Sequence, residues 1–256
     1  MKALVTGATS GIGMSIAGKL SKKGWELILT GRNEEVLKKM QAKLGSGTEI
    51  IAADLSKKDE VLRVYECCKD KDVDMLVNNA GYGLFGKCED IDLEDELNML
   101  NVNITALHIL TKLFLRDFKK KDRGIILNVA SAAGFMSGPL MSSYYASKNY
   151  VVRLTLAIYE ELRRDRSNVT VTLLCPGPVA TNFNNRAGVR FSVRPISADM
   201  AAECALKNAL AGKLFAIPSL SVKLGVFGSQ FVPHRLLSAI VYNIQHGKIQ
   251  NKDGGR

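Results

Sequence analysis

Short runs of apolar and β-branched residues alternate with longer amphipathic stretches along most of the chain. Several of these runs are apolar throughout, as strands that are buried on both faces require. Because helical patterns separate the runs, we expect an α/β fold, with a doubly wound parallel sheet of about seven strands and helices on both faces. The expected strands cover residues 2–6, 26–30, 48–53, 73–78, 124–130, 168–174 and 213–218.

Two regions depart from this alternation. Residues 176–195 form an irregular stretch that is too long for an ordinary connection, and we expect residues 182–197 to form a substrate loop. Residues 219–246 contain two amphipathic segments separated near Pro233, and we interpret them as an extension within the same domain. The chain has 256 residues, 46% of them hydrophobic, and no repeat or proline-rich linker, so residues 1–256 are expected to form a single domain.

The composition favours a cytoplasmic protein. The sequence has no run of about 18 apolar residues, and Met1 and Lys2 lead into the first strand without the apolar stretch of a signal peptide. Its cysteines form no C-x-x-C pair and have no histidine-rich neighbourhood, so we expect free thiols and no metal site. They are Cys67, Cys68, Cys88, Cys175 and Cys204.

The formal net charge of +10 raises nucleic acid and anionic surfaces as partners. The basic residues are scattered along the chain, however, and aromatic residues are not interleaved with them as a single-strand binder requires. We therefore expect no nucleic-acid partner, but a solvated basic surface that attracts an acidic substrate or carrier.

A glycine-rich turn follows the first expected strand. Residues 6–13 read TGATSGIG and lead into a helix that begins near Ile12. Glycines let a diphosphate approach the backbone closely, and the helix N-terminus offers unpaired N–H groups, so this turn predicts dinucleotide binding. Its spacing resembles the T-G-x-x-x-G-x-G turn of the short-chain dehydrogenase/reductase family, which has a single-domain Rossmann-like fold. The cofactor-binding residues assigned here are Gly7, Thr9, Ser10, Gly11, Ile12 and Gly13.

The end of the second strand indicates which dinucleotide is bound. A carboxylate about 20 positions beyond the glycines binds the ribose hydroxyls in many such folds. Here the chain has Arg32 and no carboxylate until Glu34. Because a guanidinium can bind a 2′-phosphate through two hydrogen bonds, we expect NADP(H) to be preferred over NAD(H).

Three further motifs match the family pattern, each after an expected strand. They are AADLS after the third strand, NNAG after the fourth and CPGPVATNF after the sixth. On its own chemistry, Asn79 can join two strand ends by hydrogen bonds. The resemblance implies that these motifs contact the cofactor through Asp54, Leu55, Asn79, Ala80, Gly81, Pro176, Gly177, Val179 and Thr181.

Residues 142–148 read SSYYASK and contain the candidate proton donor. On a helix, both Tyr144 and Tyr145 lie near Lys148, so helical geometry does not choose between them. The family resemblance does, because Tyr144 fits its Y-x-x-x-K motif and lies thirteen residues after Ser131. Tyr145 is then left as a packing or pocket residue.

Carbonyl reduction by a nicotinamide leaves negative charge on an oxygen, which must receive a proton. We expect Tyr144 to donate that proton, Lys148 to lower the pKa of Tyr144 and to bind the nicotinamide ribose and the cofactor, and Ser131 to hydrogen-bond the substrate oxygen. Asn103 matches the helix asparagine that supports a water-linked proton path in the family, with Asn98 and Asn101 as nearby competitors.

The resemblance thus implies an NADP(H)-dependent enzyme that interconverts a carbonyl and an alcohol, as a homodimer or homotetramer. Phe183, Phe191 and the apolar residues after Leu220 suggest a lipophilic or acyl-type small-molecule substrate. The alternatives are a dinucleotide-binding regulatory protein without turnover, and an epimerase or dehydratase on the same scaffold. Residues 219–246 suit a lid, a contact between subunits or, less readily, a peripheral membrane contact.

Overall fold

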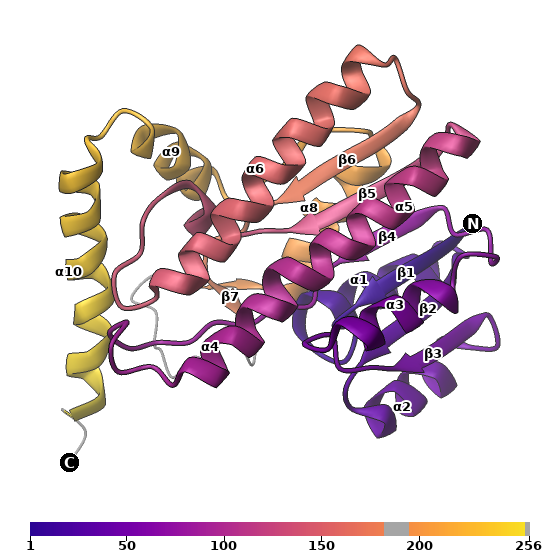
Figure 1. Cartoon of the computed structure of the whole chain (residues 1–256), viewed down its shortest axis with the longest axis horizontal. Coiled ribbons are helices and arrows are strands. Elements are labelled where there is room, and N and C mark those ends of the chain that lie inside the picture. Colours follow the sequence, from indigo (N-terminus) through magenta and orange to yellow (C-terminus); the bar gives the residue numbers. More distant parts are fainter. Residues whose placement is uncertain (182–194, 254–256) are drawn as a thin grey trace.

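Figure 1 shows the computed structural model of the chain, in which residues 1–181 and 195–253 are described, with side chains up to residue 247. Seven strands form one parallel sheet in the order β3-β2-β1-β4-β5-β6-β9. The order reverses between β1 and β4, which creates the crevice where ligands bind in such sheets. The strands are β1 (Lys2–Thr6), β2 (Glu26–Gly31), β3 (Thr48–Ala52), β4 (Met75–Asn78), β5 (Gly124–Val129), β6 (Val169–Leu174) and β9 (Phe215–Ala216).

The seven-stranded sheet confirms the expected fold, and only two of its strands differ from the expected ranges by more than one residue. β4 begins at Met75 rather than at residue 73, because its pairing with β1 begins there. Only Phe215 and Ala216 of the expected strand 213–218 pair with β6, so the edge strand β9 is short.

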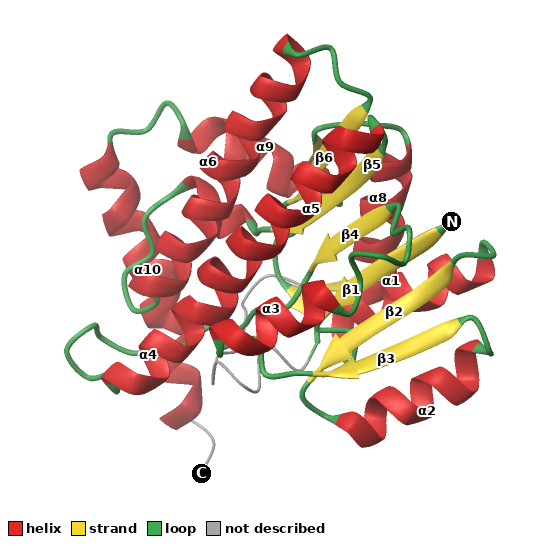
Figure 2. Cartoon of the chain, turned by 45° about the vertical axis from the view of Figure 1, so that its right-hand side comes forward, coloured by secondary structure: helices red, strands yellow, loops and turns green. Residues whose placement is uncertain are grey.

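Helices cover both faces of the sheet, as Figure 2 shows. Alternate residues of β1 pack on opposite sides: Val5 joins a core with Ile16, whereas Leu4 joins a core with Phe114. This two-sided burial confirms the doubly wound architecture. One face packs against α1 (Gly11–Lys22), α2 (Glu34–Leu44) and α8 (Ala198–Leu210), and the other against α3 (Lys58–Glu66), α5 (Leu107–Lys121) and α6 (Ser142–Arg164).

A π-helical turn interrupts the long helix that follows β4. α4 (Leu93–Leu100) continues through η1 (Asn101–Ala106) directly into α5. Asp92 begins α4 by accepting hydrogen bonds from the backbone N–H groups of Glu94 and Asp95. A π turn often marks a functional position, and here it contains Asn103.

The two irregular regions of the sequence lie next to the carboxyl ends of the strands. β7 (Val179–Ala180) pairs with β8 (Ile196–Ser197), so the two ends of the expected substrate loop adjoin. Most of that loop, including Phe183 and Phe191, lies outside the described residues.

The C-terminal region forms two helices, α9 (Leu220–Ser229) and α10 (His234–Asp253), which lie on either side of Pro233. A short helix η2 (Ala132–Phe135) follows β5 and packs against α9 and α6. None of the described helices is long and apolar enough to cross a lipid bilayer.

Candidate active site

A cavity of about 680 Å³ lies at the carboxyl ends of the parallel strands. Its walls are formed by the segments that follow β1 to β6, because parallel strands bring all these ends to one edge of the sheet. Of the site residues expected from sequence, all but Gly13 and Asn103 line it. Those present are Gly7, Thr9, Ser10, Gly11, Ile12, Arg32, Asp54, Leu55, Asn79, Ala80, Gly81, Ser131, Tyr144, Lys148, Pro176, Gly177, Val179 and Thr181.

The glycine-rich turn forms one end of this cavity. Gly7 and Gly11 have φ angles of +62° and +54°, which side-chain-bearing residues rarely adopt. A Cβ on Gly7 would lie 2.8 Å from the Cα of Ala80, and one on Gly11 would lie 2.9 Å from Cγ2 of Thr181. Together with the N–H groups at the start of α1, this bare backbone suits the diphosphate of a dinucleotide.

Gly13 is packed closely against the protein itself and does not line the cavity, and its assignment as a cofactor-binding residue stays a prediction. A Cβ on Gly13 would lie 2.4 Å from Nδ2 of Asn79 and 2.5 Å from the carbonyl oxygen of Gly7. Nδ2 of Asn79 donates hydrogen bonds to the carbonyl oxygens of Thr6 and Gly7, at 2.9 and 3.1 Å. Asn79 therefore joins the ends of β4 and β1, as the sequence suggested, and Gly13 leaves room for it.

Arg32 and Asp54 line the cavity beyond β2 and β3. Asp54 Oδ1 accepts hydrogen bonds from the backbone N–H and the hydroxyl of Ser56, at 3.1 and 2.9 Å. Burial raises the pKa of Asp54, but these hydrogen bonds and the charge of Arg32 bring it below its ordinary value. The exposed Arg32 side chain makes no hydrogen bond or ion pair with a described residue, which leaves its guanidinium available to a ligand.

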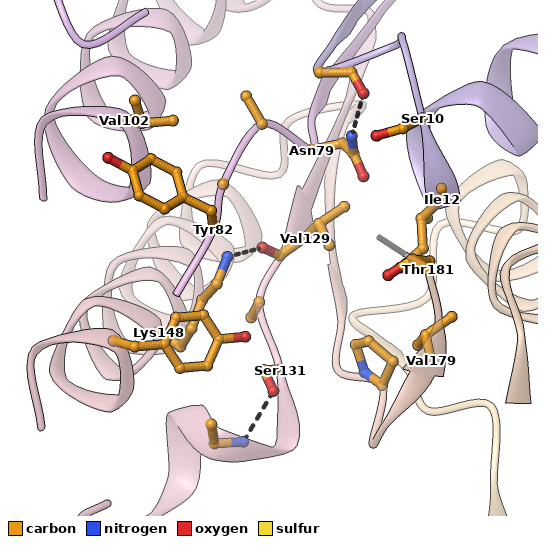
Figure 3. Close-up of a pocket in the computed structure, with 18 of the residues that line it drawn as sticks. Ser10, Ile12, Asn79, Tyr82, Val102, Val129, Ser131, Lys148, Val179 and Thr181 are labelled. Carbon is orange, nitrogen blue, oxygen red and sulfur yellow. Dashed lines mark hydrogen bonds between the residues drawn. The ribbon is translucent and has the colours of Figure 1, made fainter. Parts of the chain in front are cut away.

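Ser131, Tyr144 and Lys148 meet in the middle of the cavity. Tyr144 packs beside Met141, and its hydroxyl is hydrogen-bonded to Ser131. Lys148 is 5% exposed, and its Nζ donates a hydrogen bond of 2.9 Å to the carbonyl oxygen of Val129 (Figure 3). Nζ lies 5.9 Å from the centroid of the Tyr144 ring. The structure thus brings together the three reacting residues expected from sequence.

Burial dominates the pKa values of this group. It raises the pKa of Tyr144, an effect that the hydrogen bond from Ser131 partly offsets, and it lowers the pKa of Lys148 to about 8. The net shift in the pKa of Tyr144 is opposite to the one expected from Lys148, because loss of solvation outweighs the hydrogen bond from Ser131. At neutral pH the phenol is therefore protonated and the lysine is still charged.

Asn103 lies behind the cavity wall, in the π-helical turn η1, and its role in a proton path stays a prediction. Its side chain is completely buried. Nδ2 donates hydrogen bonds to the carbonyl oxygen of Tyr82 and the hydroxyl of Ser147, and Oδ1 accepts one from the N–H of Tyr82, at 2.9 to 3.1 Å. Of its competitors, Asn98 is exposed and Asn101 accepts a hydrogen bond from Thr105.

The substrate side of the cavity includes residues that the sequence motifs missed. Tyr145 lines it, as expected of a pocket residue, and Nε2 of Gln245 donates a 2.6 Å hydrogen bond to its hydroxyl. Val241, Ile244 and Gln245 line the cavity from α10, and their spacing of three and four residues predicts that they share one side of a helix. Val241 and Ile244 are among the apolar residues after Leu220 that were expected at a substrate pocket, whereas the missed residues include Tyr82, Val102, Met136, Met141 and Gln245.

Comparison with known proteins assigns this arrangement to a family. The family model for short chain dehydrogenase matches residues 1–189. The chain belongs to the short-chain dehydrogenase family. D-beta-hydroxybutyrate dehydrogenase of Rhizobium meliloti is 36% identical over 186 residues, which cover 70% of this chain and 71% of that protein.

Solved structures agree with this assignment over most of the chain. A short-chain dehydrogenase from Sphingobium yanoikuyae in complex with NADPH has a TM-score of 0.82 and 27% identity, covering 90% of this chain and 92% of its own. A family member from Burkholderia phymatum in complex with NAD has a TM-score of 0.80 and 25% identity, covering 88% and 91%. This short-chain dehydrogenase is thus an oxidoreductase of the alcohol and carbonyl type.

Proposed function

We propose that this protein is an NADP(H)-dependent oxidoreductase that interconverts a lipophilic carbonyl compound and its alcohol. The observation that supports it most is the hydrogen-bonded pair of Ser131 and Tyr144 beside the buried ammonium of Lys148, in the same cavity as the glycine-rich turn. The family resemblance adds a homodimer or homotetramer to this proposal, and the sequence composition adds a cytoplasmic location.

The residues of the cavity suit the cofactor and the chemistry. The bare backbone at Gly7 and Gly11 would hold the diphosphate, and Arg32 the 2′-phosphate. When bound, NADPH supplies the hydride that reduces the carbonyl carbon. Ser131 would orient the carbonyl oxygen, to which Tyr144 donates its proton, and charged Lys148 stabilises the phenolate that remains.

Solved relatives bind either dinucleotide, so they do not decide the preference of this protein. Arg32, which lines the cavity, is the residue that supports NADP(H). We expect Arg32→Ala to weaken NADPH binding by roughly 10- to 100-fold, because it removes charge-assisted hydrogen bonds to the 2′-phosphate. NADH binding should change little. Fluorescence titration with each dinucleotide measures both values.

Arg153→Ala is the matched control, because Arg153 is also exposed but lies outside the cavity lining. It should leave both affinities unchanged. Tighter binding of NADH than of NADPH by the unaltered protein would contradict the assignment of Arg32.

The substrate side of the cavity supports a lipophilic substrate. Met136, Met141, Val102, Val241 and Ile244 contribute apolar surface near Tyr144. NADPH oxidation measured with a panel of aldehydes, ketones, quinones, 3-oxoacyl thioesters and steroids tests the proposal, and we expect turnover with the larger apolar carbonyls. NADPH binding without any turnover would favour the regulatory alternative. Conversion of a substrate without net NADPH consumption would favour an epimerase or dehydratase.

A further inference from the structure

The two C-terminal helices expose an unusual number of large apolar side chains. On α9, Leu220, Leu224 and Phe227 are between 63% and 72% exposed, and their spacing of four and three residues places them along one stripe, while Phe231, in the turn after the helix, is 73% exposed. The rings of Phe227 and Phe231 contact each other edge to face, with centroids 5.1 Å apart. We use the name C-terminal apolar surface for Leu220, Leu224, Phe227, Phe231, Leu236, Ile240 and Ile244, which are 43% to 73% exposed.

This surface belongs to helices that are held firmly against the rest of the protein. On α10, Leu237, Val241 and Gln245 are 8%, 5% and 1% exposed, so one side of the helix is buried. The hydroxyl of Ser238 is hydrogen-bonded to that of Ser137, at 2.6 Å. Figure 1 shows α9 and α10 together at one end of the molecule, beyond α6. The exposed side is therefore preformed and does not depend on helix folding at a partner.

The acidic and basic residues of segment 204–252, which contains the C-terminal apolar surface, all have one sign. Between Glu203 and Asp253 the sequence has no acidic residue, but six basic ones: Lys207, Lys213, Lys223, Arg235, Lys248 and Lys252. Lys223 and Arg235, which are exposed on α9 and α10, form no ion pair with a described residue. Lysines elsewhere do, as in the pairs of Lys119 with Asp165 and of Lys121 with Asp72.

We propose that the C-terminal apolar surface docks on an anionic lipid bilayer, with the apolar side chains in the interface and the basic residues against the head groups. Apolar surface flanked by basic residues alone is the pattern of helices that lie on such membranes. A second copy of the chain is a poorer occupant. In a two-fold contact, the same patch meets itself, which brings like charges together without an acidic residue from this region to pair with them.

Docking in this way would also orient the substrate cavity toward the lipid. This consequence rests on the proposed function, in which the substrate is lipophilic. Ile244 belongs to the C-terminal apolar surface, with 52% exposure, and also lines the cavity. Its neighbours Val241 and Gln245 continue the lining inward. A lipophilic substrate would then pass from the bilayer into the cavity along α10.

Vesicle sedimentation of the full chain tests the docking surface. We expect binding to vesicles of phosphatidylglycerol and phosphatidylcholine, and much weaker binding to phosphatidylcholine alone. The double variant Phe227→Ser/Phe231→Ser should lower the partition constant for anionic vesicles roughly 100-fold, since each buried phenyl group contributes about tenfold or more. Met200→Ser/Leu210→Ser, which removes two side chains of 55% and 42% exposure on α8, is the matched control and should bind as the unaltered protein does.

A second variant tests the charges, and a binding assay tests the fold. Lys223→Glu/Arg235→Glu should abolish the preference for anionic vesicles, whereas NADPH titration of each variant should give an unchanged affinity. Absence of vesicle binding, or equal binding to neutral and anionic vesicles, would overturn the proposal. The proposal would also be overturned if the unaltered protein formed an oligomer that bound no vesicles and that Phe227→Ser/Phe231→Ser dissociated in sedimentation velocity. The occupant of the surface would then be a second copy of the chain. Vesicle sedimentation requires no turnover, whereas the proposed function is tested by NADPH oxidation. A failure of membrane docking and a failure of the proposed function can therefore be distinguished.

Discussion

Replacing Tyr144 by phenylalanine is expected to lower kcat for carbonyl reduction by roughly 10²- to 10⁴-fold, the usual contribution of a positioned acid. The ring keeps its packing beside Met141, and only the hydroxyl that bonds to Ser131 is lost. NADPH affinity should therefore change little. Steady-state kinetics and fluorescence titration with NADPH measure the two effects separately.

Tyr145→Phe is the matched control for this experiment. It removes the neighbouring phenol hydroxyl, which accepts the hydrogen bond from Gln245, and leaves the reacting group intact. Loss of one such bond costs about 1 kcal/mol, so we expect less than a tenfold fall in kcat. If Tyr145→Phe abolished turnover and Tyr144→Phe did not, the assignment of the proton donor would be wrong.

Gly13→Ala is expected to lower both the free energy of unfolding and the affinity for NADPH. Its Cβ would meet the Asn79 amide and the carbonyl oxygen of Gly7, and relieving that clash must break the link between β1 and β4. Overpacking of this kind costs about 1–3 kcal/mol. Because the same movement displaces the cofactor-binding turn, NADPH binding should weaken at least tenfold. Urea denaturation and NADPH titration give the two quantities.

Gly18→Ala, in the same helix, is the control for helix propensity. Nothing lies within 4 Å of the Cβ that it adds, so the substitution should stabilise the protein by about 0.5–1 kcal/mol. NADPH binding should not change. Equal effects of the two substitutions would show that the tight contacts around Gly13 have no energetic consequence.

Much of the fold and of the cofactor side of the site could be predicted from sequence, because local signals and topology reinforce one another there. Each motif directly follows a strand, and parallel pairing brings all strand ends to one edge. Because Gly7, Asn79 and Pro176 each follow a predicted strand, their positions in the sequence also predicted that they lie at the same edge of the sheet. The choice of Tyr144 over Tyr145 depended on a spacing that matches a known family, since both phenols line the cavity.

The parts that could not be predicted depend on contacts between distant segments. Gln245 reaches Tyr145 across 100 residues of sequence, and nothing near either residue indicates that contact. Asn103 could be selected by residue type and helical position, but its hydrogen bonds to the backbone of Tyr82 could not be predicted, because the two residues lie 21 positions apart in the sequence. The pKa of Tyr144 likewise depends on how deeply the folded protein covers its hydroxyl.

The contribution of α10 to the cavity also separates its residues along the chain. Every other described element that lines the cavity precedes α10. The glycine-rich turn, Ser131, Tyr144 and Lys148 all come before His234, whereas Val241, Ile244 and Gln245 come after it. A change of sequence confined to the last helix can therefore reshape the apolar end of the cavity and leave the glycine-rich turn as it is.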